Sequence, residues 1–263
     1  MNRILFEREA VGKSGEIVRL SGRAAHHILS VLKARPGSIL RLGEIGGARY
    51  NEAELVAVEE QEPGKPVVSV RIGTPTPPLA RAPYDLLLAM PRPKCLSRLL
   101  PQIAAFGVRR LFLTAAEKVE KSYWGSTRVR EEERRALLLE GLEQSGDTIL
   151  PEVRIVRRLK PFLEDEIPLL YPSGSRFFAH PDNPGDEHRG SVCLSAGREA
   201  WHGFREASVS SGEGLLAIGP EGGWSPFEVA LFDRLGFRRL SLGERIFRTD
   251  TAVVGLLALA DCR

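Results

Sequence analysis

Hydrophobic positions near the C-terminus form short apolar runs that lead into glycine-containing loops. Leu215–Ile218 is uninterrupted apolar sequence, which is typical of a strand buried on both faces of a sheet. Ser225 followed three residues later by Glu228 predicts a capped helix start, and Gly236 predicts its end. A second strand is expected over Phe237–Leu242. The pattern therefore predicts a strand–helix–strand unit of an α/β sheet.

A final helix is expected over Thr251–Ala260, which is apolar nearly all round and therefore predicted to be buried. The two strands deliver glycines, in Gly219–Gly223 and at Gly243, to one edge of a parallel sheet, where open α/β proteins bind ligands. Bare backbone groups in such loops can approach a flat heterocycle closely. The alternative is that these glycines only supply positive φ angles in ordinary turns.

Residues 1–73 show the short, turn-separated segments of a small β-rich unit. Strands are expected at Ile17–Leu20, Ser38–Leu42, Ala53–Val58 and Val67–Ile72. One helix, Ala24–Ala34, is predicted among them. Its core-facing side is expected to hold Ala25, Ile28, Leu29, Val31 and Leu32.

The proline-rich residues 74–83 have no helical or strand period, so we place a linker there. Strands and helices alternate over residues 84–263, which predicts an α/β domain with a parallel sheet. The expected strands are Tyr84–Met90, Arg110–Thr114, Val153–Val156 and Arg176–Ala179. The expected helices are Leu96–Phe106 and Arg128–Gln144.

Two long motifs resemble one known family. IGPEGGWSPFE followed by LSLGERIFRTDTA resembles the paired signature of the 16S rRNA (uracil-N3)-methyltransferase family, the RsmE family of the SPOUT superfamily. Asp250 stands where that family has Glu. The resemblance implies a C-terminal trefoil knot, S-adenosylmethionine (SAM) as cofactor, ribosomal RNA of the small subunit as partner, and a homodimer.

The N-terminal unit is similar to the PUA-like RNA-binding barrel that this family carries. The similarity covers HHILSVLKARPGSILRL and YNEAEL. We expect an RNA-contacting face, since Lys and Arg neutralise phosphates; the alternative is a scatter of solvated charges, offset by nearby glutamates. The candidate RNA-binding residues are Arg3, Arg23, His26, Lys33, Arg35 and Arg49, with Arg245 from the C-terminal domain.

SAM carries a sulfonium and an adenine but no phosphate, so it suits uncharged backbone loops. The expected cofactor-binding residues are His180, Ile218, Gly219, Pro220, Glu221, Gly222, Gly223, Leu240, Leu242, Gly243, Ile246, Thr249, Thr251 and Ala252. Glu221 is also a catalytic candidate. The alternative for Glu221 is a carboxylate favoured by the dipole of the following helix.

A uracil that loses its N3 proton places negative charge on its carbonyl oxygens, which a guanidinium would stabilise. Arg248 is the first candidate for that role and Arg245 the second; the alternative for Arg248 is an ion pair with Asp250. The sequence identifies no general base, and positioning alone can support in-line displacement.

The segment Pro101–Phe106 lacks polar residues that the resembled family presents near its site. It keeps open a non-catalytic RNA-binding or ribosome-assembly protein of the same fold. A SPOUT methylase of a different RNA position is a further alternative. Glu143 and Gln144 resemble a family segment, but they also read as a plain helix end before Gly146.

Composition adds little to this interpretation. The 263 residues carry a formal net charge of +3, which permits RNA binding without requiring it. The lack of a signal peptide, of a membrane-spanning run and of paired cysteines predicts a cytoplasmic protein. His180, His188, Cys193 and His202 match no zinc spacing, so no metal is expected. Phosphate-loop and serine-hydrolase motifs are absent from the sequence.

Overall fold

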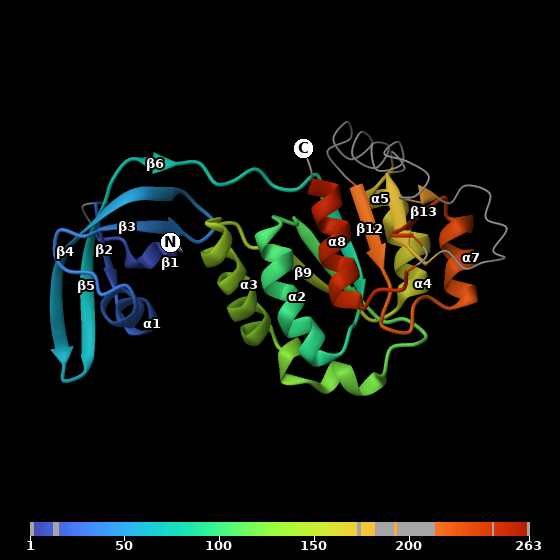
Figure 1. Ribbon diagram of the computed structural model, residues 1–263, viewed down its shortest axis with the longest axis horizontal. Coiled ribbons are helices and arrows are strands. Elements are labelled where there is room, and N and C mark those ends of the chain that lie inside the picture. Colours follow the sequence, from blue (N-terminus) through green and yellow to red (C-terminus); the bar gives the residue numbers. More distant parts are fainter. Residues whose placement is uncertain are drawn as a thin grey trace. The chain divides into compact units, whose positions relative to one another are not determined.

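The protein divides into two compact units. The computed structural model describes residues 3–12, 16–172, 175–181, 192–193, 214–243 and 245–261, and its elements are labelled in Figure 1. The first unit contains Met1–Ala80 and Leu139–Leu150, and the second contains Arg81–Leu138 and Pro151–Arg263. The change of unit at residues 80–81 falls within the proline-rich segment 74–83. Residues 139–150, which the sequence places after the linker, pack in the first unit.

The first unit is built on a mixed sheet. Its main strand order is β1-β3-β4-β5-β2, and β6 pairs with β4. The strands are β1 (Ile4–Phe6), β2 (Ile17–Leu20), β3 (Ile39–Glu44), β4 (Arg49–Glu62), β5 (Lys65–Ile72) and β6 (Pro75–Thr76). β1, which the sequence did not predict, pairs in parallel with β3, while the other pairs are antiparallel. Alternating side chains such as Leu40, Leu42 and Val70 form the core.

The predicted helix of this unit is interrupted. An α-helical segment, α1 (Gly22–His26), passes directly into a π-helical turn, η2 (His27–Val31). A π turn adds residues per turn and so shifts which side chains face the core. Ala25 and Ile28 are buried as predicted, but Val31 is 60% exposed. The prediction that Val31 faces the core was wrong for this reason.

The second unit holds a seven-stranded parallel sheet with the order β11-β13-β10-β12-β7-β8-β9. The strands are β7 (Tyr84–Ala89), β8 (Arg110–Thr114), β9 (Glu152–Val156), β10 (Arg176–Ala179), β11 (Val192–Cys193), β12 (Gly214–Ile218) and β13 (Arg238–Ser241). All of their pairings are parallel, which confirms the predicted α/β class. β7 and β12 are buried throughout, as expected for strands whose residues, apart from Asp85 in β7, form apolar runs.

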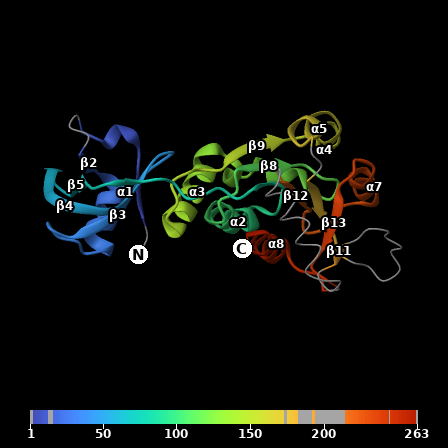
Figure 2. The same cartoon turned by 90° about the horizontal axis from the view of Figure 1, so that it is seen from above.

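Helices cover both faces of this sheet. The helices of the second unit are α2 (Pro93–Ala105), α4 (Leu159–Pro161), α5 (Ile167–Leu170), α7 (Pro226–Arg234) and α8 (Thr249–Asp261), while α3 (Glu131–Ser145) begins in the second unit and ends in the first. Figure 2 shows α2 and α8 on one face and α4, α5 and α7 on the other. The helical segment 159–170 was not predicted. α8 is not buried all round, because Val254, Ala258 and Leu259 are partly exposed.

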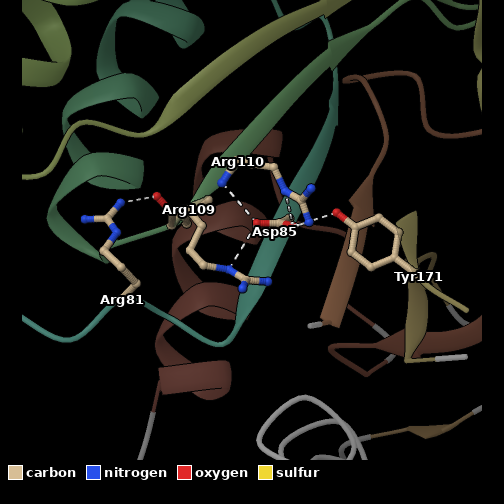
Figure 3. Close-up of polar contacts among 6 residues, drawn as sticks. Arg81, Asp85, Arg109, Arg110 and Tyr171 are labelled. Carbon is tan, nitrogen blue, oxygen red and sulfur yellow. Dashed lines mark hydrogen bonds and ion pairs between the residues drawn. The ribbon is translucent and has the colours of Figure 1, made fainter. Parts of the chain in front are cut away.

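A buried ionic cluster joins the amino ends of the strands (Figure 3). The carboxylate of Asp85 is fully buried and accepts hydrogen bonds from Arg110 Nε at 2.8 Å and from the Tyr171 hydroxyl at 2.6 Å. Arg109 Nε lies 3.5 Å from the same carboxylate, and Arg81 donates to the Val108 carbonyl. A buried charge needs such partners to offset its desolvation. The cluster is structural, since it lies at the edge opposite the carboxyl ends of the strands.

Candidate cofactor and RNA sites

A cavity of about 750 Å³ lies at the carboxyl ends of β10, β12 and β13. Its walls are the end of β10 with His180, the loop Gly219–Trp224, the loop from Leu242 to Phe247, and the start of α8. Parallel strands bring these segments to one edge although they are far apart in sequence. This is the edge that the glycine loops predict as a ligand site.

Different glycines of the cavity loops serve different purposes. A Cβ on Gly219 would lie 3.3 Å from the Trp224 ring, and one on Gly222 would lie 3.1 Å from Lys118 Cδ. Gly223 and Gly243 instead have φ angles of 68° and 100°, which disfavour any side chain. Gly219 and Gly222 are therefore explained by close packing, and Gly223 and Gly243 by their positive φ angles.

Trp224 fixes the glycine loop to the core. Its ring is 2% exposed and packs edge-on against Phe232, with centroids 4.9 Å apart. Its indole Nε1 is buried and has no hydrogen-bond partner among the described residues. A buried N–H without an acceptor is unfavourable, so this cavity wall has an unused donor.

The carboxylate of Glu228 anchors the start of α7 by accepting two backbone N–H groups. The Ser225 hydroxyl accepts the Glu228 amide, and Glu228 Oε2 accepts the Ser225 amide at 2.8 Å, which forms the predicted capping box. Glu228 Oε1 also accepts the Glu117 amide at 2.8 Å. The loop after β8 is thereby attached to the helix that follows the glycine loop.

Glu221 lies in the wall of the cavity but is exposed. Its Oε1 accepts the backbone N–H of Arg92 at 3.0 Å. Its partner is thus the loop after β7 rather than an amide of the following helix.

The structure brings together nearly all of the predicted cofactor-binding residues. Those that line the cavity are His180, Ile218, Gly219, Pro220, Glu221, Gly222, Gly223, Leu240, Leu242, Gly243, Ile246, Thr249 and Ala252. Thr251 is exposed and does not line it.

The two candidate arginines are placed differently. Both are exposed, but Arg245 lines the cavity and Arg248 does not. The carboxylate of Asp250 pairs with Arg98 at 2.7 Å, rather than with Arg248 as the alternative supposed. The Arg248 carbonyl accepts the Ala252 amide at 2.8 Å and so begins α8.

Sequence reasoning missed several lining residues. Among them are Lys118, Trp224, Phe247, Asp233 and Leu256. Lys118 could have been found, because it follows a predicted strand whose carboxyl end meets the same edge as the glycine loops. The others lie within or beside the two motifs but carry no local signal for orientation.

Arg3 is not part of an RNA-contacting face. It is 5% exposed, and its guanidinium donates to the carbonyls of Gly146, Leu42 and Tyr50 and to Asn51 Oδ1. Four of its five N–H donors are used inside the protein, and burial keeps the side chain away from a phosphate. The prediction of RNA contact at Arg3 is corrected to a structural role inside the first unit.

The other basic candidates of the first unit remain accessible. Arg23, His26, Lys33 and Arg35 are exposed. Arg23 pairs with Glu143 at 2.6 Å, and Arg49 donates to the Pro77 carbonyl at 2.8 Å. Lys33 has a positive φ of 51°, which is uncommon for a residue other than glycine.

Metal ligands do not gather in the part of the chain that is described: no group of three His, Cys, Asp or Glu side chains is placed to hold an ion there. Of the residues considered for a metal, His188, His202 and the side chain of Cys193 lie outside the described residues. Within the same limits, no helix is long and apolar enough to cross a membrane.

Comparison with known proteins identifies the family. Residues 78–261 match the family model for the RNA methyltransferase domain. The chain belongs to this RNA methyltransferase family. The resemblance drawn from the two C-terminal motifs is therefore confirmed.

Individual relatives are similar to this chain in sequence over much of its length. It is 28% identical to the ribosomal RNA small subunit methyltransferase E of Treponema pallidum, over 98% of this chain and 90% of the relative. The protein of that name from Mesomycoplasma hyopneumoniae is 23% identical over 65% of this chain and 66% of its own. The fold is similar to a ribosomal RNA small subunit methyltransferase E from Neisseria gonorrhoeae solved with S-adenosyl methionine. That likeness has a TM-score of 0.71 at 21% identity, and covers 98% of this chain and 95% of the other.

Proposed function

We propose that this RNA methyltransferase transfers a methyl group from SAM to N3 of a uridine in small-subunit ribosomal RNA. The observation that carries the proposal is the cavity of the second unit, whose walls are mainly backbone loops and apolar side chains. Relatives named for small-subunit ribosomal RNA support the substrate class.

The residues present fit the cofactor. The bare backbone at Gly219 and Gly222 leaves space that a Cβ would fill, and the Nε1–H of Trp224 is an unused donor. Glu221 and Asp233 bring negative charge to the walls, while Lys118 and Arg245 bring positive charge. This mixture suits a ligand that has both cationic groups and a carboxylate. Bound there, SAM supplies an electrophilic methyl group.

The chain's own residues position the acceptor and stabilise its charge. N3 lies on the pairing edge of uracil, so the base has to be unpaired before it can react. As the N3 proton passes to solvent water, charge develops on the carbonyl oxygens, and a guanidinium of the loop 245–248 stabilises it. The cavity wall favours Arg245 for this role over Arg248, which sequence reasoning put first. Glu221 holds the loop after β7 rather than moving a proton.

The finer architecture belongs to the same proposal. The mixed sheet of the first unit serves as a PUA-like RNA-binding barrel with Arg23, His26, Lys33 and Arg35 on its surface. The second unit carries the trefoil knot. Support for the knot comes from α8, which follows β13 yet packs against α2, with Arg98 and Asp250 paired between these helices. The chain therefore returns across the sheet, as a knot requires.

The active form is a homodimer in the cytoplasm. Ile246 is 81% exposed and Phe247 42% exposed at the cavity, although both are large and apolar. Val254, Ala258 and Leu259 on α8 are only partly covered. A second copy of the chain would remove this apolar surface from water.

The experiment that tests the function has two steps. Calorimetry first measures SAM binding to the full chain. Mass spectrometry then measures N3-methyluridine in small-subunit RNA incubated with protein and SAM. Binding without methyl transfer would favour the non-catalytic alternative, which is motivated by the altered segment Pro101–Phe106. A methylated nucleoside other than N3-methyluridine would assign a different RNA base.

A further inference from the structure

A basic and aromatic segment borders the cofactor cavity. It consists of Arg92 from the loop after β7 and Lys94 from the first turn of α2, with Lys118, Lys121 and Tyr123 from the segment after β8; we call these five residues the rim. Figure 1 shows the green segment that follows β8 running along the edge toward which β12 points. The rim therefore lies at the same edge of the sheet as the cavity.

Two contacts join the rim to the cavity wall. The Lys118 ammonium donates to the Gly222 carbonyl at 2.8 Å, and the Arg92 amide donates to Glu221 Oε1 at 3.0 Å. Glu117, beside Lys118, is attached through its amide to Glu228. A strand bound along the rim would thus lead directly into the cavity.

The rim is positively charged and exposed. Arg92, Lys94, Lys118 and Lys121 are all exposed, and the acidic side chains near them among the described residues are Glu117, Glu120 and Glu221, so the cations remain in excess. Arg128 is set aside because Glu133 pairs with it at 3.0 Å. Unbalanced exposed cations beside the site of an RNA methyltransferase favour an anionic polymer as the occupant.

A hydrogen bond orients Tyr123. Its hydroxyl donates to Glu120 Oε1 at 2.7 Å, and the Arg92 guanidinium lies close to the same hydroxyl. The neighbouring Trp124 is less suited to stacking, because the guanidinium of Arg157 lies 4.3 Å from its ring centroid. An oriented aromatic ring among cations is the arrangement that stacks unpaired bases.

We propose that the rim binds the single-stranded RNA next to the target base, with a base stacked on Tyr123 and phosphates at Arg92 and Lys121. This deepens the proposed function, because it names how the acceptor strand reaches the cavity. Neither resembled motif includes the rim.

Binding of a short fluorescent single-stranded RNA to the full chain tests the proposal. Tyr123→Leu is expected to weaken binding on the order of tenfold, since stacking on one aromatic ring contributes that much, while Tyr123→Phe keeps the ring and binds nearly as wild type. Arg92→Gln is expected to lower the slope of log affinity against log salt by about 0.7, the value for one phosphate contact on a single strand. SAM affinity, measured by calorimetry, stays unchanged in Tyr123→Leu.

Matched controls lie elsewhere in the second unit. Phe227→Leu removes another exposed aromatic ring, and Arg154→Gln removes another exposed, ion-paired arginine; neither should change RNA affinity. Wild-type affinity and salt slope in Tyr123→Leu and Arg92→Gln would overturn the proposal. So would a change confined to oligomeric state, which would make the rim an interface between copies. If the wild-type chain binds RNA through the rim but transfers no methyl group, the rim proposal holds and the proposed function is wrong.

Discussion

The ammonium of Lys118 lies 2.8 Å from the carbonyl oxygen of Gly222 and 3.5 Å from that of Trp224. One side chain from the loop after β8 thus spans the glycine loop that walls the cavity. The alkyl stem of the lysine also packs where a Gly222 side chain would be. Lys118 therefore determines the shape of the loop as well as its charge.

Replacing Lys118 is expected to weaken SAM binding without unfolding the protein. Lys118→Met keeps the stem but removes both hydrogen bonds from a charged donor, and we expect SAM affinity to fall by a factor of about three to ten. Lys118→Arg should retain most of it. Lys160→Met, at an exposed lysine on α4, is the matched control. Calorimetry of SAM binding is the measurement, and unchanged affinity in Lys118→Met would contradict the role.

The two arginines of the loop 245–248 can be separated by turnover. Removing one group that stabilises developing charge lowers kcat by about 10²–10³. We expect that loss for Arg245→Ala, with SAM affinity within a few-fold of wild type, and a smaller loss for Arg248→Ala. Single-turnover methylation of RNA is the measurement. The opposite order would assign the charge-stabilising role to Arg248, as the sequence motif suggested.

Arg3 and Arg35 should differ in which property they affect. Arg3→Met removes the donor from the buried carbonyls of Leu42 and Tyr50 and from the partly buried carbonyl of Gly146, so the free energy of unfolding is expected to fall by about 3 kcal/mol. Arg35→Gln should leave unfolding unchanged and weaken RNA binding about twofold to fivefold. Urea unfolding and RNA titration measure the two effects. If Arg3→Met is as stable as wild type but binds RNA more weakly, Arg3 contacts RNA and its structural role is contradicted.

Stability should fall at alkaline pH partly through Tyr171. Burial, with the adjacent Asp85 carboxylate, raises the pKa of the Tyr171 phenol well above its usual value near 10. The unfolded chain then loses a proton that the folded chain keeps, so stability is present below about pH 10 and falls as the pH rises further. The fall for one group approaches about 1.4 kcal/mol per pH unit.

Urea unfolding of wild type and Tyr171→Phe between pH 8 and pH 11 measures this contribution. The variant is less stable at pH 8 because Asp85 loses a donor, but its stability should fall less steeply above pH 10. Burial also raises the pKa of Cys95 to about 11, so some slope remains in both proteins. If the free energy of unfolding falls with pH equally steeply in both proteins, Tyr171 does not cause the loss of stability at alkaline pH.

Sequence patterns predicted the second unit better than the first, and physical reasons explain the difference. Buried parallel strands such as Leu215–Ile218 are visible as apolar runs, and the start of α7 is determined by local capping between Ser225 and Glu228. The π turn that exposes Val31 has no such local signal. The burial of Arg3 depends on carbonyls far away in sequence, which periodicity does not reveal.

The cavity could be predicted in outline for a similar reason. Both glycine loops follow recognisable strands, so the edge at which they meet was evident. Which arginine of the loop 245–248 lines the cavity depends on side-chain direction after β13. The contribution of Lys118 depends on strand order, because β8 has to lie two strands from β12 for its loop to reach Gly222.

The packing of residues 139–150 in the first unit affects the order in which the chain can fold during its synthesis. Arg3 donates through its backbone to Glu143 and through its side chain to Gly146, and Thr148 donates to the Gly47 carbonyl at 2.7 Å. The contacts that join Arg3 and Gly47 to residues 143–148 can therefore form only after more than half of the protein has been translated. During that interval β1, the edge strand of the first sheet, presents an unpaired polar edge to chaperones and to other nascent chains.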